Sequence, residues 1–271
     1  MNNKPRFPER IVCLTEETTE TLYLLGEDWR IVGISGFTVR PARARREKPR
    51  VSAFTSAKID RIVELRPDLV LGFSDLQADI AAELVRAGIE VHVFNHRSVA
   101  EILRTVAIIG GMIGCEAKAT GLVEQLSAGL QAARERAAML PARPRVYFEE
   151  WDEPQISAIR WVSELIGIAG GDDCFPELAT QALGKNRIIA DPTEVPRRAP
   201  DIILGSWCGK KFRPESVKAR PGWQDVPAIR NDLVIEIKSS LILQPGPAAL
   251  TDGIAEIQKA IAVWARSRAE R

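Results

Sequence analysis

Apolar and polar positions follow two different rhythms along the first 97 residues. Short runs rich in β-branched residues, typical of buried strands, alternate with stretches in which apolar residues recur every three or four positions, typical of helices. The expected strands are residues 10–14, 31–35, 51–54, 68–73 and 89–94. Strands and helices in alternation predict a mainly parallel sheet covered by helices.

The pattern changes from Ser98 to about Met139, where apolar residues keep a helical period. Gly110, Gly111 and Gly114 interrupt this stretch. It therefore predicts one helix, a break near 110–115, and a second, longer helix. A helix of roughly 20–25 residues extends over about 30 Å or more, which is long enough to connect two lobes.

Strand and helix patterns alternate again after Pro144, and residues 194–207 (EVPRRAPDIILGSW) resemble residues 61–74 (RIVELRPDLVLGFS). This repeat favours two related lobes. The predicted fold class is therefore α/β, with two Rossmann-like lobes built on central, mainly parallel sheets and joined by a long helix. The expected division is an N-terminal lobe over 1–97, a helical linker over 98–140 and a C-terminal lobe over 141–271.

Composition and charge exclude some classes of function and set an expected location. The 271 residues carry a formal net charge of +1, which gives no field suited to nucleic acid. No stretch approaches the roughly 20 apolar residues of a membrane span, and the N-terminus lacks the apolar core of a signal peptide. The chain as written is thus expected in the cytoplasm, and a signal segment missing from it would make the protein periplasmic. The four cysteines show no CxxC spacing and are expected as buried apolar residues.

Aromatic residues follow most of the predicted strands, at the end where open parallel sheets bind their ligands. Core packing explains any one of these rings, but together they favour an aromatic-lined cleft shared by the two lobes, able to grip a large flat ligand. The candidate ligand-binding aromatics are Phe37, Phe54, Phe73, Trp151 and Trp207.

Polar candidates accompany the rings. Glu17 follows the first strand, where capping of the next helix by the neighbouring threonines is the alternative interpretation, and Lys210 and Lys211 follow Trp207 as anion contacts. No motif suggests a reaction, so no catalytic residue is assigned. Two histidines and scattered cysteines also supply too few ligands for a metal site. Cys208 stays open as a nucleophile or thiol ligand.

The chain resembles the helical-backbone (class III) solute-binding proteins of ABC transporters, and within them the vitamin B12-binding proteins. The resemblance runs through ERIVCLTEETTETLYLLG, IDRIVELRPDLVLGF, AGIEVHVFNHRSVAEILRTVAIIGGMIG and WVSELIGIAGG. It implies a rigid helix between the lobes and a non-enzymatic protein without an intrinsic cofactor, expected as a monomer. The implied ligand is cobalamin or a related corrinoid.

Two positions match the family's contacts with a membrane permease: Asp60, and Glu194 at the equivalent point of the repeat. The alternatives are a haem or ferric-siderophore binder, favoured if His96 or Glu149 faces a metal, and a cytoplasmic enzyme or chaperone that handles tetrapyrroles. The chain also departs from its relatives, since Ala169 stands where they have a cysteine and an export signal is lacking. These departures suggest a cytoplasmic member, or one without its permease.

Overall fold

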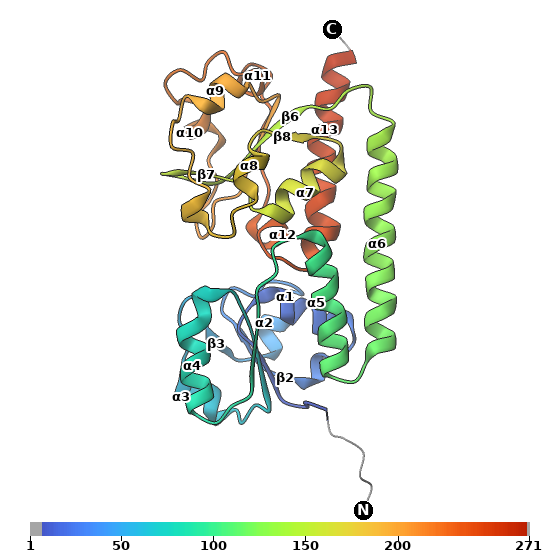
Figure 1. Cartoon of the computed structure of the whole chain (residues 1–271), viewed down its shortest axis with the longest axis vertical. Coiled ribbons are helices and arrows are strands. Elements are labelled where there is room, and N and C mark those ends of the chain that lie inside the picture. Colours follow the sequence, from blue (N-terminus) through green and yellow to red (C-terminus); the bar gives the residue numbers. More distant parts are fainter. Residues whose placement is uncertain (1–6, 270–271) are drawn as a thin grey trace, which may run out of the picture. The chain divides into compact units, whose positions relative to one another are not determined.

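The computed structural model describes residues 7–269. They fall into two compact units (Figure 1). Unit 1 contains the residues up to 96 together with 100–126, and unit 2 contains 97–99 and the residues from 127 onward. The long helix α6 (Glu116–Ala138) contributes residues to both units. The boundaries expected from the sequence, with a separate linker over 98–140, stay a prediction.

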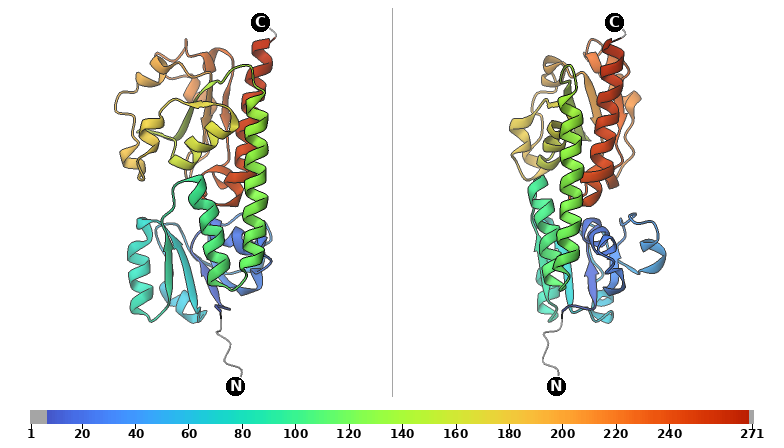
Figure 2. Two further views of the ribbon diagram at one scale, coloured as in Figure 1. Left: turned by 45° about the vertical axis from the view of Figure 1, so that its right-hand side comes forward. Right: turned by 90° about the vertical axis from the view of Figure 1, so that its right-hand side faces the viewer.

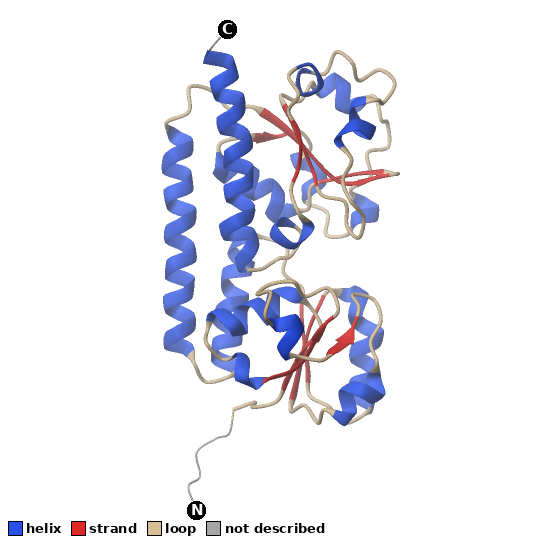
Figure 3. Ribbon diagram, turned by 180° about the vertical axis from the view of Figure 1, so that it is seen from behind, coloured by secondary structure: helices blue, strands red, loops and turns tan. Residues whose placement is uncertain are grey.

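Unit 1 is built on a five-stranded sheet with the order β3-β2-β1-β4-β5, in which all neighbours are parallel (Figure 3). All five strands were predicted from their short β-branched runs, and the structure confirms them with bounds that differ by up to two residues. The strands are β1 (Ile11–Cys13), β2 (Ile31–Ser35), β3 (Arg50–Ser52), β4 (Leu69–Phe73) and β5 (Val91–Phe94).

Side chains that alternate along these strands build two apolar layers. Ile11 and Cys13 belong to the layer shared with α1, α2, α5 and α6, whereas Val12 and Leu14 belong to the layer shared with α3 and α4. Burial on both faces explains why the strands read as continuous apolar runs. The helices are α1 (Glu16–Leu24), α2 (Ala44–Glu47), α3 (Ile59–Glu64), α4 (Ala78–Arg86) and α5 (Val99–Met112), with short 3-10 turns η1 (Asp28–Arg30) and η2 (Asp75–Gln77).

The glycine-rich break predicted near 110–115 is confirmed, because α5 ends at Met112 and α6 begins at Glu116. The two helices then run side by side (Figure 2). At Gly110 an added Cβ would lie 2.2 Å from the Cβ of Ala119, so the missing side chain allows α5 to approach α6 closely.

Unit 2 contains a second five-stranded sheet with the order β10-β9-β6-β7, in which β8 also pairs with β6. Three of its neighbour pairs are parallel, and the β6–β7 hairpin is antiparallel. The two mainly parallel sheets confirm the predicted α/β fold class. The strands are β6 (Arg145–Asp152), β7 (Gln155–Ser157), β8 (Asp172–Asp173), β9 (Ile202–Gly205) and β10 (Val234–Glu236).

Helices cover both faces of this sheet (Figure 1). Val146 of β6, Ile166 of α7 and Ile261 of α13 meet around Gly171 on one face. Phe175, Val195 and Val217, from α8, α9 and α10 or the residues beside them, help to fill the other. The helices are α7 (Arg160–Ala169), α8 (Pro176–Ala179), α9 (Glu194–Arg198), α10 (Pro214–Lys218), α11 (Pro227–Arg230), α12 (Ser239–Ile242) and α13 (Ile254–Ala269), with a 3-10 turn η3 (Gly184–Asn186) and a π-helical turn η4 (Ala249–Gly253).

Candidate ligand-binding site

The candidate residues of unit 1 lie just beyond the carboxyl ends of β1 to β4. Phe37, after β2, is exposed over 53% of its surface and is therefore available for a partner. Phe54, after β3, is partly buried against the apolar layer, and Phe73, at the end of β4, belongs to that layer. Phe73 also contacts His96 edge to face, with ring centroids 5.0 Å apart. The three rings thus differ in availability, from exposed Phe37 to buried Phe73.

Gln77 fixes the loops that carry two of these rings. Its side chain is fully buried and accepts a hydrogen bond from the backbone N–H of Phe73 at 2.9 Å. It also donates to the carbonyl of Phe54 at 2.9 Å. A buried amide bonded in both directions holds the end of β4 and the loop after β3 in one arrangement, although β2 and β1 lie between these strands in the sheet. Sequence reasoning missed Gln77, whose position in a polar turn gives no signal.

Glu17, which follows β1 at the same end of the unit 1 sheet, is an unusual carboxyl group. It lies in the first turn of α1, is 2% exposed, and accepts a hydrogen bond from the Thr15 hydroxyl through one oxygen. Its other oxygen is buried without a hydrogen-bond partner among the described residues. Burial raises the pKa of Glu17 to about 8 and that of the neighbouring Glu16 to about 7. Glu17 therefore holds a proton at neutral pH.

In unit 2, Trp151 lies near the end of the long strand β6 and Trp207 follows strand β9, and one cation contacts both rings. The Lys210 ammonium lies 4.5 Å from the ring centre of Trp151 and 4.8 Å from that of Trp207. The same ammonium is 2.6 Å from a carboxylate oxygen of Asp152. Lys210 thus binds both rings through cation–π contacts, and Asp152 offsets its charge. Trp151 is half-buried, whereas Trp207 is 4% exposed.

A buried charged network holds Trp207 in place. Its indole N–H donates to Glu149 at 3.0 Å, and Glu149 is fully buried. Arg220 donates to both oxygens of the same carboxylate, at 2.5 and 2.9 Å, and the Tyr147 hydroxyl donates at 3.0 Å. Burial, followed by the nearby Glu149 charge, raises the pKa of Tyr147 well above its usual range. Glu149 is therefore committed to this network.

Phe212 closes the other side of Trp207. The two rings meet edge to face with centroids 4.9 Å apart, and Phe212 is 1% exposed. Gly205 makes this possible, because an added Cβ there would lie 1.8 Å from a ring atom of Phe212. The segment LGSWCGKKF (residues 204–212) is thus a packing unit, with Cys208 and Lys211 exposed at its surface. The expectation that the cysteines are buried is therefore wrong for Cys208. Lys211 forms no ion pair within the part of the chain that the structure describes.

The two histidines offer no open metal position. His96 is 2% exposed, and His92 lies within β5, where burial lowers its pKa. Residues 7–269 contain no group of three or more histidine, cysteine or acidic side chains able to hold a metal ion. The buried thiols of Cys13 and Cys174 have pKa values raised by burial to about 12, so neither is activated.

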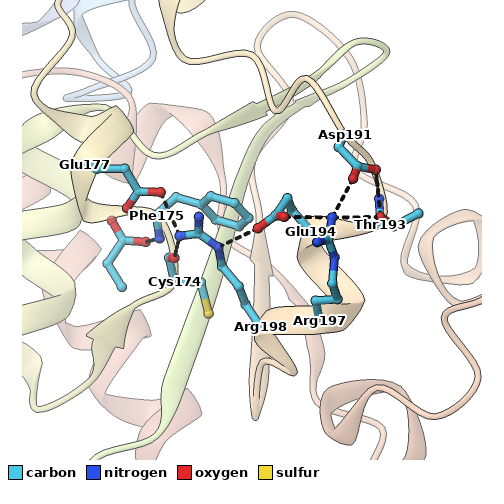
Figure 4. A network of polar contacts seen from close by, with 9 residues as sticks. Cys174, Phe175, Glu177, Asp191, Thr193, Glu194, Arg197 and Arg198 are labelled. Carbon is cyan, nitrogen blue, oxygen red and sulfur yellow. Dashed lines mark hydrogen bonds and ion pairs between the residues drawn. The ribbon is translucent and has the colours of Figure 1, made fainter.

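The two carboxylates assigned to docking differ in their surroundings. Asp60, in the first turn of α3, is exposed and forms no ion pair among residues 7–269. Glu194, in the first turn of α9, pairs with Arg197 at 2.7 Å and with Arg198 at 3.3 Å (Figure 4). Arg198 also pairs with Glu177 at 2.7 Å. The charge of Glu194 is already shared within unit 2, whereas that of Asp60 is not.

A model of the periplasmic binding protein family matches residues 11–241. The chain belongs to the periplasmic binding protein family. It is thus a substrate-binding protein of the ABC-transporter type, a class that binds small molecules and docks to a permease. The predicted relationship is confirmed. None of residues 7–269 lies in a helix with the length and apolar content of a membrane span.

Several proteins of known sequence or structure resemble this family member. An uncharacterized ABC transporter substrate-binding lipoprotein of Bacillus subtilis, YvrC, is 25% identical over 94% of this chain and 80% of its own length. A cobalamin-binding protein of Halobacterium salinarum is 28% identical over 73% of this chain, which spans only about half (51%) of that protein. The solved periplasmic heme-binding protein RhuT of Roseiflexus sp. RS-1 shares the fold, with a TM-score of 0.78 and 24% identity over 93% of this chain and 98% of its own.

One of these relatives is named as a lipoprotein of an ABC transporter and another as a periplasmic protein. The lipoprotein and the periplasmic protein among them give no support to the cytoplasmic location expected from the sequence.

Proposed function

We propose that the protein binds a corrinoid, such as cobalamin, as cargo and performs no reaction on it. The observation that carries this proposal is the assembly of Trp151, near the end of β6, with Lys210 and Trp207, which follow β9. Its rings are held before any ligand arrives, because Trp207 is bonded to Glu149 and Lys210 to Asp152. Preorganised rings bind a flat macrocycle with little loss of conformational entropy.

The candidate residues fall into two groups, those that contact the ligand and those that hold the contacting rings in place. Phe37 and Phe54 of unit 1 and Trp151 of unit 2 keep exposed surface and are assigned to ligand contact. Lys211 is assigned as the anion contact of unit 2, since Asp152 already offsets the charge of Lys210. Phe73 and Trp207 are buried and support the neighbouring rings. The similarity to a cobalamin-binding protein agrees with a corrinoid ligand.

A haem or ferric siderophore is the second candidate, and the buried acids argue against it. The metal-facing role considered for His96 or Glu149 conflicts with their burial. Haem carries two anionic propionates, whereas the corrin ring carries neutral amide side chains that donate hydrogen bonds. Glu17 holds a proton at neutral pH and has no cation paired with it among the described residues, so it can accept a hydrogen bond from a corrin amide and supplies no positive charge to pair with a propionate.

Removing one ring tests the contact assignment. Trp151→Ala should weaken cyanocobalamin binding at least tenfold, about 1.4 kcal/mol, because it deletes an exposed stacking surface and leaves the Glu149 network intact. Isothermal titration of wild type and variant measures the change. The matched control is Trp29→Ala, which removes a 58% exposed tryptophan before β2. Equal affinity in all three proteins would remove Trp151 from the site.

A further inference from the structure

A cavity of about 650 Å³ lies at the edge of the unit 1 sheet, beside the outermost strand β3. Four basic residues line it, from the stretch before β3, from β3 itself and from the loop that follows. They are Arg45, Lys48, Arg50 and Lys58. The remaining lining is glycine, alanine, serine and proline, with no acidic side chain. Neither the resemblance nor the proposed corrinoid site accounts for this concentration of positive charge.

These four cations also lack the partners that their neighbours have. Arg40 and Arg43, in the same basic run, pair with Glu20 at 2.9 Å and with Asp28 at 3.4 Å. None of the four basic side chains of the cavity forms an ion pair with any carboxylate of residues 7–269. Four positive charges thus line one cavity without a paired carboxylate among the described residues, and a bound anion would offset them.

The size and the donor types indicate which anion fits. A volume of about 650 Å³ lies within the range of small-molecule pockets, roughly 300–1,000 Å³, and exceeds what a bare ion needs. Guanidinium groups bind phosphate oxygens in pairs, and lysine ammonium groups bind them as point charges. Two arginines and two lysines suit a group with several charged oxygens better than one carboxylate. A phosphate with an organic group attached meets both conditions.

We propose that this cavity binds the phosphate of a phosphate ester. Lys48 and Arg50 lie on either side of Pro49 at the start of β3, so they are the residues whose removal should affect the site most. The phosphate has two possible sources, a separate small phosphate ester or the phosphodiester that complete corrinoids carry in their nucleotide loop. Both present charged phosphate oxygens to the cavity, about two negative charges from a monoester and one from the phosphodiester.

Titration with inorganic pyrophosphate tests the cavity without any corrinoid. Wild type should bind it saturably, with affinity that falls as salt is added, and the double variant K48Q/R50Q should lose at least tenfold in affinity. The control R46Q/R86Q removes two exposed arginines of unit 1 that do not line the cavity, and should stay within about twofold of wild type. No pyrophosphate binding by wild type, or an equal loss in both double variants, would overturn the proposal.

Comparing the binding of cobalamin with that of cobinamide, which lacks the phosphate, identifies the source of the phosphate that the cavity binds. A phosphate supplied by the cargo predicts tighter binding of cobalamin, competition by pyrophosphate, and loss of the preference in K48Q/R50Q. A separate phosphate ester predicts equal binding of both corrinoids, unaffected by pyrophosphate. If neither corrinoid binds wild type, the proposed function fails, and the pyrophosphate titration still decides whether the cavity is an anion site.

Discussion

At the scale of single residues, the molecule commits two kinds of buried acid to different tasks. Glu149 is ionically paired and bonded to three side chains, so it stabilises unit 2 around Trp207. Glu17 has a single hydroxyl partner and no cation paired with it among the described residues, so its charge is suppressed. The surroundings, and not the residue type, decide whether a carboxyl group acts as an anchor or as a proton-bearing hydrogen-bonding group.

Replacing Glu149 should strongly destabilise unit 2. Glu149→Gln leaves the Arg220 guanidinium, with 18% of its side chain exposed, without a counter-charge, so the free energy of unfolding should fall by about 3 kcal/mol. Urea denaturation followed by tryptophan fluorescence measures the loss. Glu256→Gln breaks the exposed pair with Lys259 and should cost less than about 1 kcal/mol. Similar losses in both variants would contradict the anchoring role of Glu149.

Glu17 should make stability depend on pH. Its folded-state pKa of about 8 lies above the ordinary value of 4.5, so the folded protein holds a proton that the unfolded chain releases between these values. The free energy of unfolding therefore falls as pH rises through this window. Between pH 5 and 8, wild type should lose roughly 2–4 kcal/mol relative to Glu17→Gln. A constant difference between the two proteins across this range would contradict the raised pKa.

At the scale of elements, close approach of helices explains which glycines matter. Gly110 and Gly111 are adjacent in α5, yet an added Cβ at Gly110 would meet Ala119 of α6 at 2.2 Å, and one at Gly111 would meet nothing within 4 Å. Gly110→Ala should destabilise the protein by about 1–3 kcal/mol through overpacking. Gly111→Ala should stabilise it by about 0.5–1 kcal/mol by favouring the helix. Thermal unfolding of the two variants measures both, and equal effects would contradict the helix contact.

The sequence predicts the long elements well because their apolar period reflects burial on both sheet faces. It missed the short strand β7, whose three residues show neither a strand nor a helix period, and the four- and five-residue helices α2, α10 and α12. It placed aromatic residues at the strand ends, but it gave no sign that Trp207 is buried and Phe37 exposed. Arg220, 71 residues from Glu149, also escaped notice, because only the folded chain brings the two together.

At the scale of the whole molecule, membership of the periplasmic binding protein family implies a permease partner. We propose Asp60 and Glu194 as its contacts, with unequal weight, because Arg197 and Arg198 already share the charge of Glu194. In cells that carry the permease, Asp60→Lys should reduce ligand uptake more than Glu194→Lys, with ligand affinity unchanged. Glu83→Lys, an exposed control in α4, should leave uptake intact. Equal uptake by Asp60→Lys and this control would remove Asp60 from the interface.

The central claim is that the protein selects a corrinoid through preorganised aromatic rings and through the Glu17 carboxyl group, whose negative charge is suppressed. The most direct measurement incubates wild-type protein separately with cobalamin, cobinamide and haemin, removes unbound ligand by desalting, and records the visible spectrum. The account predicts that a corrinoid chromophore stays with the protein in a ratio near one to one and that haemin is removed. Retention of haemin alone, or of no chromophore at all, would contradict it.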